Sequence, residues 1–192
     1  MRDEAGPKER IVKTAVSLFY RQGVNATGIN QIIDEASVAK ASFYYHFKSK
    51  DDLVAETVYS FGNMVKERFR RVVHNSTTPM EFITAFVKIL KRDIQSDEYF
   101  GCPIANIAFD TDAGSVKIHT ILSGVMDEIL VLLTDFIHEM RVKGHLTSQA
   151  DEAIIAKRML QVYEGALTMW KMTGDAAYAD DLEYMMKRII FV

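Results

Sequence analysis

Residues 36–53 read Ala-Ser-Val-Ala-Lys-Ala-Ser-Phe-Tyr-Tyr-His-Phe-Lys-Ser-Lys-Asp-Asp-Leu, a stretch in which aromatic, hydroxyl and basic side chains are interspersed. A compact helix is predicted from Lys40 to about His46. At about 100° per residue, Phe43 and Phe47 share one face of this helix, and we expect both in the core. The opposite face then carries two small or hydroxyl side chains and two phenols, those of Ala41, Ser42, Tyr44 and Tyr45.

A second short helix is predicted just before this one. Apolar residues at Ile29, Ile32, Ile33 and Ala36 have helical spacing after Thr27, and residues 37–39 form a tight turn between the two helices. Two short helices joined in this way are typical of a helix-turn-helix. The outward face of the second helix could enter the major groove of DNA, with residues 30–37 lying across the backbone. An ordinary surface helix with two exposed tyrosines remains an alternative.

Lys50 gives an independent indication of an outside partner. It lies in the first helical turn after Ser49, where the helix dipole disfavours a cation. A phosphate would be bound there by Lys50 together with the free backbone N–H groups of the helix start. The alternative is a solvated lysine whose charge is offset by Asp51 and Asp52.

The rest of the chain also reads as helix, with no strand-like alternation over more than a few residues, so the predicted fold class is all-α. The first helix is expected to end at Gly23, and Ser49 with Asp52 predicts the cap of a long helix. Thr78 and Pro79 are typical of another start, and Ser148 with Asp151 of a later cap. The further helices are expected at about 49–74, 79–90, 104–109, 115–142, 148–173 and 178–190.

Composition fits a folded globular protein, with 48% hydrophobic residues, 26% charged residues and only 3 prolines in 192 residues. Cys102 is the one cysteine, so no intramolecular disulfide is possible, and we expect it to be a small buried residue beside Pro103. The first ten residues hold no apolar stretch typical of a signal peptide, and no run is apolar enough to span a membrane, which predicts a cytoplasmic protein without membrane contact.

The charge is unevenly distributed along the chain. Residues 1–75 carry 12 Lys and Arg against 9 Asp and Glu, whereas the remainder carries 11 against 17. A basic first part on an acidic remainder allows a polyanion to bind at one end, although shifts of this size also occur on solvated surfaces.

Catalytic and metal chemistry find little support in the sequence. The histidines are too scattered for a predicted metal site, and no nucleophile-elbow, P-loop or dinucleotide-binding motif occurs. We therefore expect no cofactor, no metal and no enzymatic activity.

The blocks at residues 27–32, 36–40 and 42–53 together resemble the DNA-binding domain of the tetracycline-repressor (TetR) family. The resemblance implies a three-helix helix-turn-helix domain over 1–50, joined through the helix of about 49–74 to a helical domain over 75–192. It also implies a recognition segment from Lys40 to Tyr45 and phosphate contacts from Thr27, Tyr44, His46 and Lys50. The full set of expected DNA-binding residues is Thr27, Gln31, Lys40, Ala41, Ser42, Tyr44, Tyr45, His46 and Lys50.

Three positions depart from the family pattern. Ser37 stands where glycine is usual in the turn, Ala39 where a Ser or Thr would cap the next helix, and Ala41 where glycine is frequent. The missing cap costs about 0.5–2 kcal/mol of local helix stability. Ser37 must then accept a glycine-like backbone or a slightly different turn.

Beyond residue 75 the resemblance implies a domain that binds a small molecule and forms a homodimer through helices at about 148–173 and 176–191. Residues 101–105 and 164–166 are similar to lincomycin-resistance-type repressors. The expected ligand-lining residues are Phe86, Leu90, Tyr99, Phe100, Phe109, Met126, Met159, Tyr163 and Trp170, although most could equally be core.

The resulting functional hypothesis is a repressor that dimerises on an inverted-repeat operator of double-stranded DNA and is released by a small-molecule effector. The rival hypotheses are a helical enzyme, and a helical dimeric adaptor or small-molecule-binding protein without DNA-binding activity.

Overall fold

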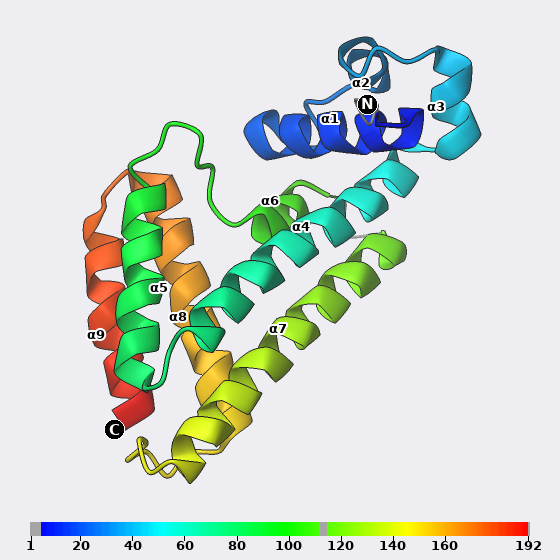
Figure 1. Cartoon of the computed structure of the whole chain (residues 1–192). Coiled ribbons are helices and arrows are strands. Elements are labelled where there is room, and N and C mark those ends of the chain that lie inside the picture. Colours follow the sequence, from blue (N-terminus) through cyan, green and yellow to red (C-terminus); the bar gives the residue numbers. More distant parts are fainter. Residues whose placement is uncertain (1–4, 112–114, 192) are drawn as a thin grey trace. The chain divides into compact units, whose positions relative to one another are not determined.

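The computed structural model describes residues 5–111 and 115–191, and every regular element within these ranges is a helix (Figure 1). The all-α prediction is therefore confirmed. The helices are α1 (Pro7–Gln22), α2 (Ile29–Glu35), α3 (Lys40–His46), α4 (Lys50–His74), α5 (Pro79–Asp93), α6 (Pro103–Asp110), α7 (Val116–Val142), α8 (Glu152–Thr173) and α9 (Ala177–Phe191). None of the helices in these ranges is both long and apolar enough to cross a bilayer.

Contacts divide the chain into two compact units. The N-terminal unit comprises Met1–Met64 with Pro103–Val125, and the C-terminal unit comprises Val65–Cys102 with Met126–Val192. Two long helices, α4 and α7, therefore contribute residues to both units.

The core of the N-terminal unit is formed where α1 packs against both α2 and α3. The helical spacing of apolar residues explains why one side of each helix is buried. The predicted burial of Phe43 and Phe47 is confirmed, since the two side chains are 0% and 3% exposed. Other fully or nearly fully buried side chains of this unit are Ile11, Ala15, Leu18, Phe19, Ile32, Leu53, Val54, Val58 and Phe61.

The core of the C-terminal unit is aromatic. Helix α9 packs against α5 and α8, and ring contacts join α4, α5, α7 and α8. The ring of Phe86 lies 4.8 Å from Phe69, 5.4 Å from Phe82 and 4.9 Å from Tyr163, measured between centroids. Phe136 extends the cluster, 5.0 Å from Phe82. Such ring pairs add about 0.5–1.5 kcal/mol each to the stabilisation from burial.

Most predicted helix ends agree with the structure. Ser49 accepts a hydrogen bond from the Asp52 N–H at 3.1 Å, and Thr78 accepts one from the Glu81 N–H at 3.2 Å, so both predicted caps are confirmed. The predicted start near Ser148 is too early. Asp151 caps α8 instead, accepting hydrogen bonds from two backbone N–H groups of its first turn.

Candidate nucleic-acid interface

The turn between α2 and α3 depends on an unusual backbone at Ser37. Its φ of 53° lies in the left-handed region, so of the two outcomes that the sequence left open this serine adopts the glycine-like conformation. The Arg10 guanidinium donates a hydrogen bond to the Ser37 carbonyl at 3.3 Å, and the Val38 N–H donates to the Ile33 carbonyl at 3.2 Å. These bonds hold the turn and set the direction in which α3 leaves it.

Helix α3 is anchored by one face and exposed on the other. Phe43 is fully buried and its ring lies 5.9 Å from that of Phe47. On the outward side, Tyr44 is 47% exposed and Tyr45 is 85% exposed. Ala39 begins the helix without a side-chain cap, as its sequence predicted.

The exposed aromatic side chains of α3 are braced by their neighbours. Tyr44 meets Phe43 edge to face at a centroid distance of 5.3 Å, and Tyr45 meets His46 edge to face at 5.0 Å. Both phenols thus pack against one neighbouring ring while much of each side chain stays accessible to a ligand.

Basic residues surround the same surface. Lys40 is exposed and Lys50 is partly exposed, and neither forms an ion pair with any described residue. Two acidic neighbours could offset Lys50. Asp52 is bonded elsewhere, with its Oδ1 2.6 Å from the Lys117 Nζ, and Asp51 forms no ion pair with Lys50 among the described residues. The hydrogen bond from Lys117 is the largest cause that lowers the pKa of Asp52 below its ordinary value. Lys50 is therefore available to an external anion.

The structure brings seven of the nine expected DNA-binding residues onto α3 and the first residue of α4. These are Lys40, Ala41, Ser42, Tyr44, Tyr45, His46 and Lys50.

The other two, Thr27 and Gln31, have partners inside the protein. Thr27 is 1% exposed, and its hydroxyl donates to the Gly23 carbonyl at 2.6 Å. The Gln31 amide donates to Glu35 at 2.9 Å and accepts from Gln22 at 3.0 Å. Thr27 thus holds the turn that precedes α2, a role that its spacing alone did not indicate.

The residues expected to line a ligand pocket are dispersed in the structure. Phe86, Leu90, Met159 and Tyr163 are 1–4% exposed and belong to the core of the C-terminal unit. The rings of Tyr99 and Trp170 pack on each other at 5.5 Å, and Phe100 and Met126 are partly buried. Phe109 lies in the other unit and is 78% exposed.

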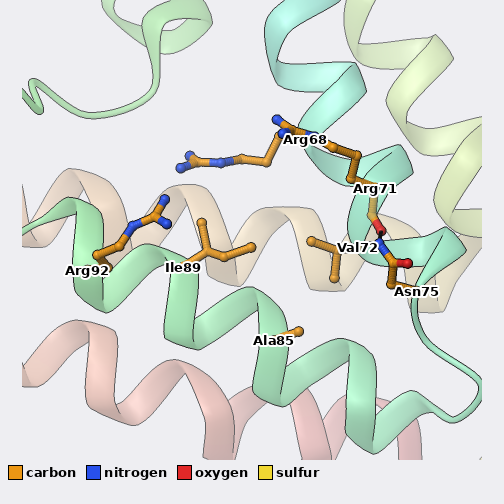
Figure 2. Close-up of a pocket in the computed structure, with 7 residues that line it drawn as sticks. All are labelled: Arg68, Arg71, Val72, Asn75, Ala85, Ile89 and Arg92. Atoms are coloured by element: carbon orange, nitrogen blue, oxygen red, sulfur yellow. Dashed lines mark hydrogen bonds between the residues drawn. The ribbon is translucent and has the colours of Figure 1, made fainter.

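A groove that the sequence did not reveal lies between α4 and α5 in the C-terminal unit (Figure 2). Within each helix the lining residues recur at intervals of three or four, a pattern that is visible in the sequence. Only the packing of the two helices brings the two sets together. They are Arg68, Arg71 and Val72 of α4, Asn75 directly after α4, and Ala85, Ile89 and Arg92 of α5. No cluster of three potential metal ligands occurs among residues 5–111 and 115–191.

Comparison with known proteins defines the class of this molecule. The family model described as "Bacterial regulatory proteins, tetR family" matches residues 11–57, and the one described as "Tetracyclin repressor-like, C-terminal domain" matches residues 80–186. The HTH-type transcriptional regulator LmrA of Bacillus subtilis (strain 168) is 30% identical over 148 residues, which cover 76% of this chain and 77% of LmrA. The chain therefore belongs to the TetR family of helix-turn-helix transcriptional regulators, as its sequence motifs predicted.

A second relative and two solved structures agree with this assignment. The uncharacterized HTH-type transcriptional regulator YxaF of Bacillus subtilis (strain 168) is 32% identical over 123 residues, 63% of this chain and 64% of YxaF. Reduced Escherichia coli NemR has a TM-score of 0.84 at 17% identity, covering 96% of this chain and 97% of NemR. A TetR-family regulator from Agrobacterium tumefaciens has a TM-score of 0.83 at 20% identity, covering 97% of this chain and 98% of that one. At these identities the two structures show the shared fold.

Proposed function

We propose that this chain represses transcription by binding an inverted-repeat operator as a homodimer, and that a small molecule bound in the C-terminal unit releases it. The observation that carries the proposal is the division of α3 into a fully buried Phe43 and an exposed outer face with Tyr44 and Tyr45. A helix anchored in this way presents a rigid polar surface of the size that fits the major groove.

Each residue of that surface has a role in the proposed complex. Ala41 allows close approach of the helix, while Ser42 and Tyr45 offer hydroxyl groups to base edges or the sugar-phosphate backbone. Lys40, Tyr44, His46 and Lys50 would bind phosphates, and Lys50 does so with the backbone N–H groups at the start of α4. In the same complex, Gln31 would exchange its hydrogen bond with Glu35 for one to DNA, and Thr27 would act by holding the turn.

Dimerisation follows from the need to read two half-sites. A single short helix makes few base contacts, and a two-fold dimer places two such helices about 34–36 Å apart on one face of a duplex. In the C-terminal unit, α8 and α9 expose apolar side chains that a dimer interface would remove from water. These candidates for the dimer interface are Ile154, Met172, Tyr184 and Met185, which are 40–74% exposed.

Helix α4 offers the route from effector to DNA. It begins at Lys50 in the proposed DNA-binding surface and continues into the C-terminal unit, where it lines the groove of Figure 2. An effector that prefers one position of this helix would change operator affinity. A coupling free energy of about 1–3 kcal/mol corresponds to roughly 5–150-fold weaker DNA binding.

The relatives named above are transcriptional regulators, and this supports a regulatory role in place of catalysis. A regulator of this kind acts in the cytoplasm, where bacterial chromosomal DNA is found. An adaptor without DNA-binding activity is the alternative that the following experiment separates.

Selection of bound sequences from random duplex DNA, performed with the full chain, tests the proposal. We expect enrichment of an inverted repeat, and at least a tenfold loss of affinity for it in Tyr45→Ala and Lys50→Ala, with the dimer intact by sedimentation. Tyr59→Ala is the matched control, because Tyr59 is also exposed but lies on α4 away from α3. Failure to enrich any sequence, or equal affinity in all variants, overturns the proposal and leaves the adaptor.

A further inference from the structure

The groove between α4 and α5 has the dimensions of a small-molecule site. Its volume is about 350 Å³, within the range of about 300–1,000 Å³ that is usual for small ligands. All of its lining residues belong to the C-terminal unit. The site is therefore defined within one compact unit.

The charged side chains that line this groove are all positive. Three guanidinium groups line it, those of Arg68, Arg71 and Arg92. The carboxylate of Asp93 pairs with Arg68 and also with Arg92, at 3.0 Å from the Arg92 guanidinium. One carboxylate thus serves two of the three cations.

Arg71 is the cation of the groove without a carboxylate partner among the described residues. Its Nε donates to the backbone carbonyl of Glu67 at 3.4 Å, and the carboxylate of Glu67 pairs with Arg70 at 2.6 Å. The Arg71 guanidinium therefore keeps donors that a charged ligand can use, while Asp93 already neutralises part of the charge of Arg68 and Arg92. The groove is therefore electrostatically complementary to a negatively charged ligand.

The remainder of the lining is apolar. Figure 2 shows Val72, Ala85 and Ile89 between the two helices, with the guanidinium groups of Arg68 and Arg92 near each other and that of Arg71 lying along α4. Val72 is 5% exposed, so its side chain closes the inner wall of the groove. An inorganic anion would leave this apolar surface in contact with water.

We propose that the groove binds a small organic anion, with a carboxylate on Arg71, whose guanidinium has no carboxylate partner among the described residues, and an apolar body against Val72, Ala85 and Ile89. The planar guanidinium group suits this ligand because it can donate two parallel hydrogen bonds to a carboxylate. The apolar body adds free energy through burial, at about 25 cal/mol per Å² removed from water. Binding of the anion to the groove is independent of the proposed function. The effect of this binding, a change in the affinity of the dimer for DNA, rests on the proposed function.

Calorimetric titration of the full chain at low salt tests the site without DNA. Octanoate is the probe; octanol has the apolar body alone, and inorganic phosphate has the charge alone. We expect octanoate to bind at least tenfold more tightly than either. Comparable binding of octanol or of phosphate, or no octanoate binding up to millimolar concentration, overturns the proposal.

Two neighbouring arginines of α4 provide a matched pair of variants. We expect Arg71→Gln to weaken octanoate binding at least tenfold, and Arg70→Gln to leave it within about twofold, because Arg70 does not line the groove. Both side chains are exposed, so both variants should fold, which thermal unfolding checks. Equal losses in the two variants would contradict the assignment. If octanoate fails to bind while the operator selection succeeds, the groove proposal falls and the regulatory function stands.

Discussion

Asp110, the last residue of α6, accepts a hydrogen bond from the backbone N–H of Asn25 at 2.8 Å through its carboxylate. The Asn25 side chain donates to the Asp110 carboxylate at 3.1 Å and to its backbone carbonyl at 2.6 Å. The same carboxylate lies so close to Gly23 that a Cβ there would be 2.8 Å from it, and Gly23 also has a φ of 90°. Helix α6 is thereby joined to the segment between α1 and α2 by polar contacts.

The hydrogen bonds between Asp110 and Asn25 predict that removing the Asp110 carboxylate lowers the stability of the fold. Asp110→Ala removes the carboxylate that accepts from Asn25, and because these hydrogen bonds are exposed we expect the free energy of unfolding to fall by about 0.5–1.5 kcal/mol in urea titrations. Asp97→Ala is the control, because this exposed carboxylate makes no hydrogen bond that the structure records. Similar changes in the two variants would show that the Asn25 contact contributes nothing.

Alanine substitution at two helical glycines is expected to change the stability of the fold in opposite directions. A Cβ on Gly62 of α4 would lie 2.7 Å from Val125 Cγ2, whereas one on Gly124 of α7 would meet no atom within 4 Å. We expect Gly62→Ala to destabilise the fold by about 1–3 kcal/mol and Gly124→Ala to stabilise it by about 0.4–1 kcal/mol. Thermal unfolding measures both changes. Recovery of stability in Gly62→Ala combined with Val125→Ala would assign the loss to the close contact, and a stable Gly62→Ala alone would refute it.

Local sequence signals predicted most of the fold. The caps at Ser49 and Thr78 were predictable because the bonding groups lie within one helical turn, and the burial of Phe43 followed from helical spacing. The helix start predicted near Ser148 was wrong because Asp151, only three residues later, is an equally good capping residue and lies nearer to the apolar run. Each of these outcomes depends on interactions between residues close in sequence.

Long-range contacts account for what the sequence did not predict. The bond between Asn25 and Asp110 joins residues 85 positions apart, and no pattern near either residue indicates it. The groove requires Arg71 and Arg92 on two helices whose pairing is a tertiary property. The hydrogen bond of Thr27 is the exception, because its partner, the Gly23 carbonyl, lies only four residues earlier in the chain.

Glu164 predicts a pH-dependent stability. Burial is the main cause that raises the pKa of this carboxyl above its ordinary value of 4.5, and a hydrogen bond with Cys102 opposes the shift. A raised pKa in the folded state gives stability that is present below about pH 4.5 and lost as the pH rises through the folded pKa. We therefore expect Glu164→Gln to be more stable than the parent at pH 7, with a difference that shrinks towards pH 4.

Glu183 provides the opposite case for the same measurement. The hydrogen bond from Lys187, at 2.6 Å, is the largest cause that lowers the pKa of Glu183. Its contribution is present above about pH 4.5 and lost as the pH falls through the folded pKa. Glu183→Gln should then be less stable than the parent at pH 7 and equal to it in acid. If both variants differed in stability from the parent at pH 7 in the same direction, the assigned effect of burial on Glu164 would be contradicted.

The lysines at the proposed DNA surface predict a change in salt dependence. Each phosphate neutralised by a protein cation contributes about −0.9 to the slope of log affinity against log salt concentration. Lys40 and Lys50 lack ion-pair partners in the described part of the chain, so each is free to neutralise one phosphate per half-site. In a dimer on two half-sites, Lys40→Ala or Lys50→Ala should reduce the magnitude of the slope by about 2. Titrations of operator binding at several salt concentrations measure the slope. Lys88→Ala controls for net charge, because Lys88 is an exposed lysine of α5 in the C-terminal unit. If the slope changed equally in all three variants, DNA would be attracted only by the overall charge of the protein.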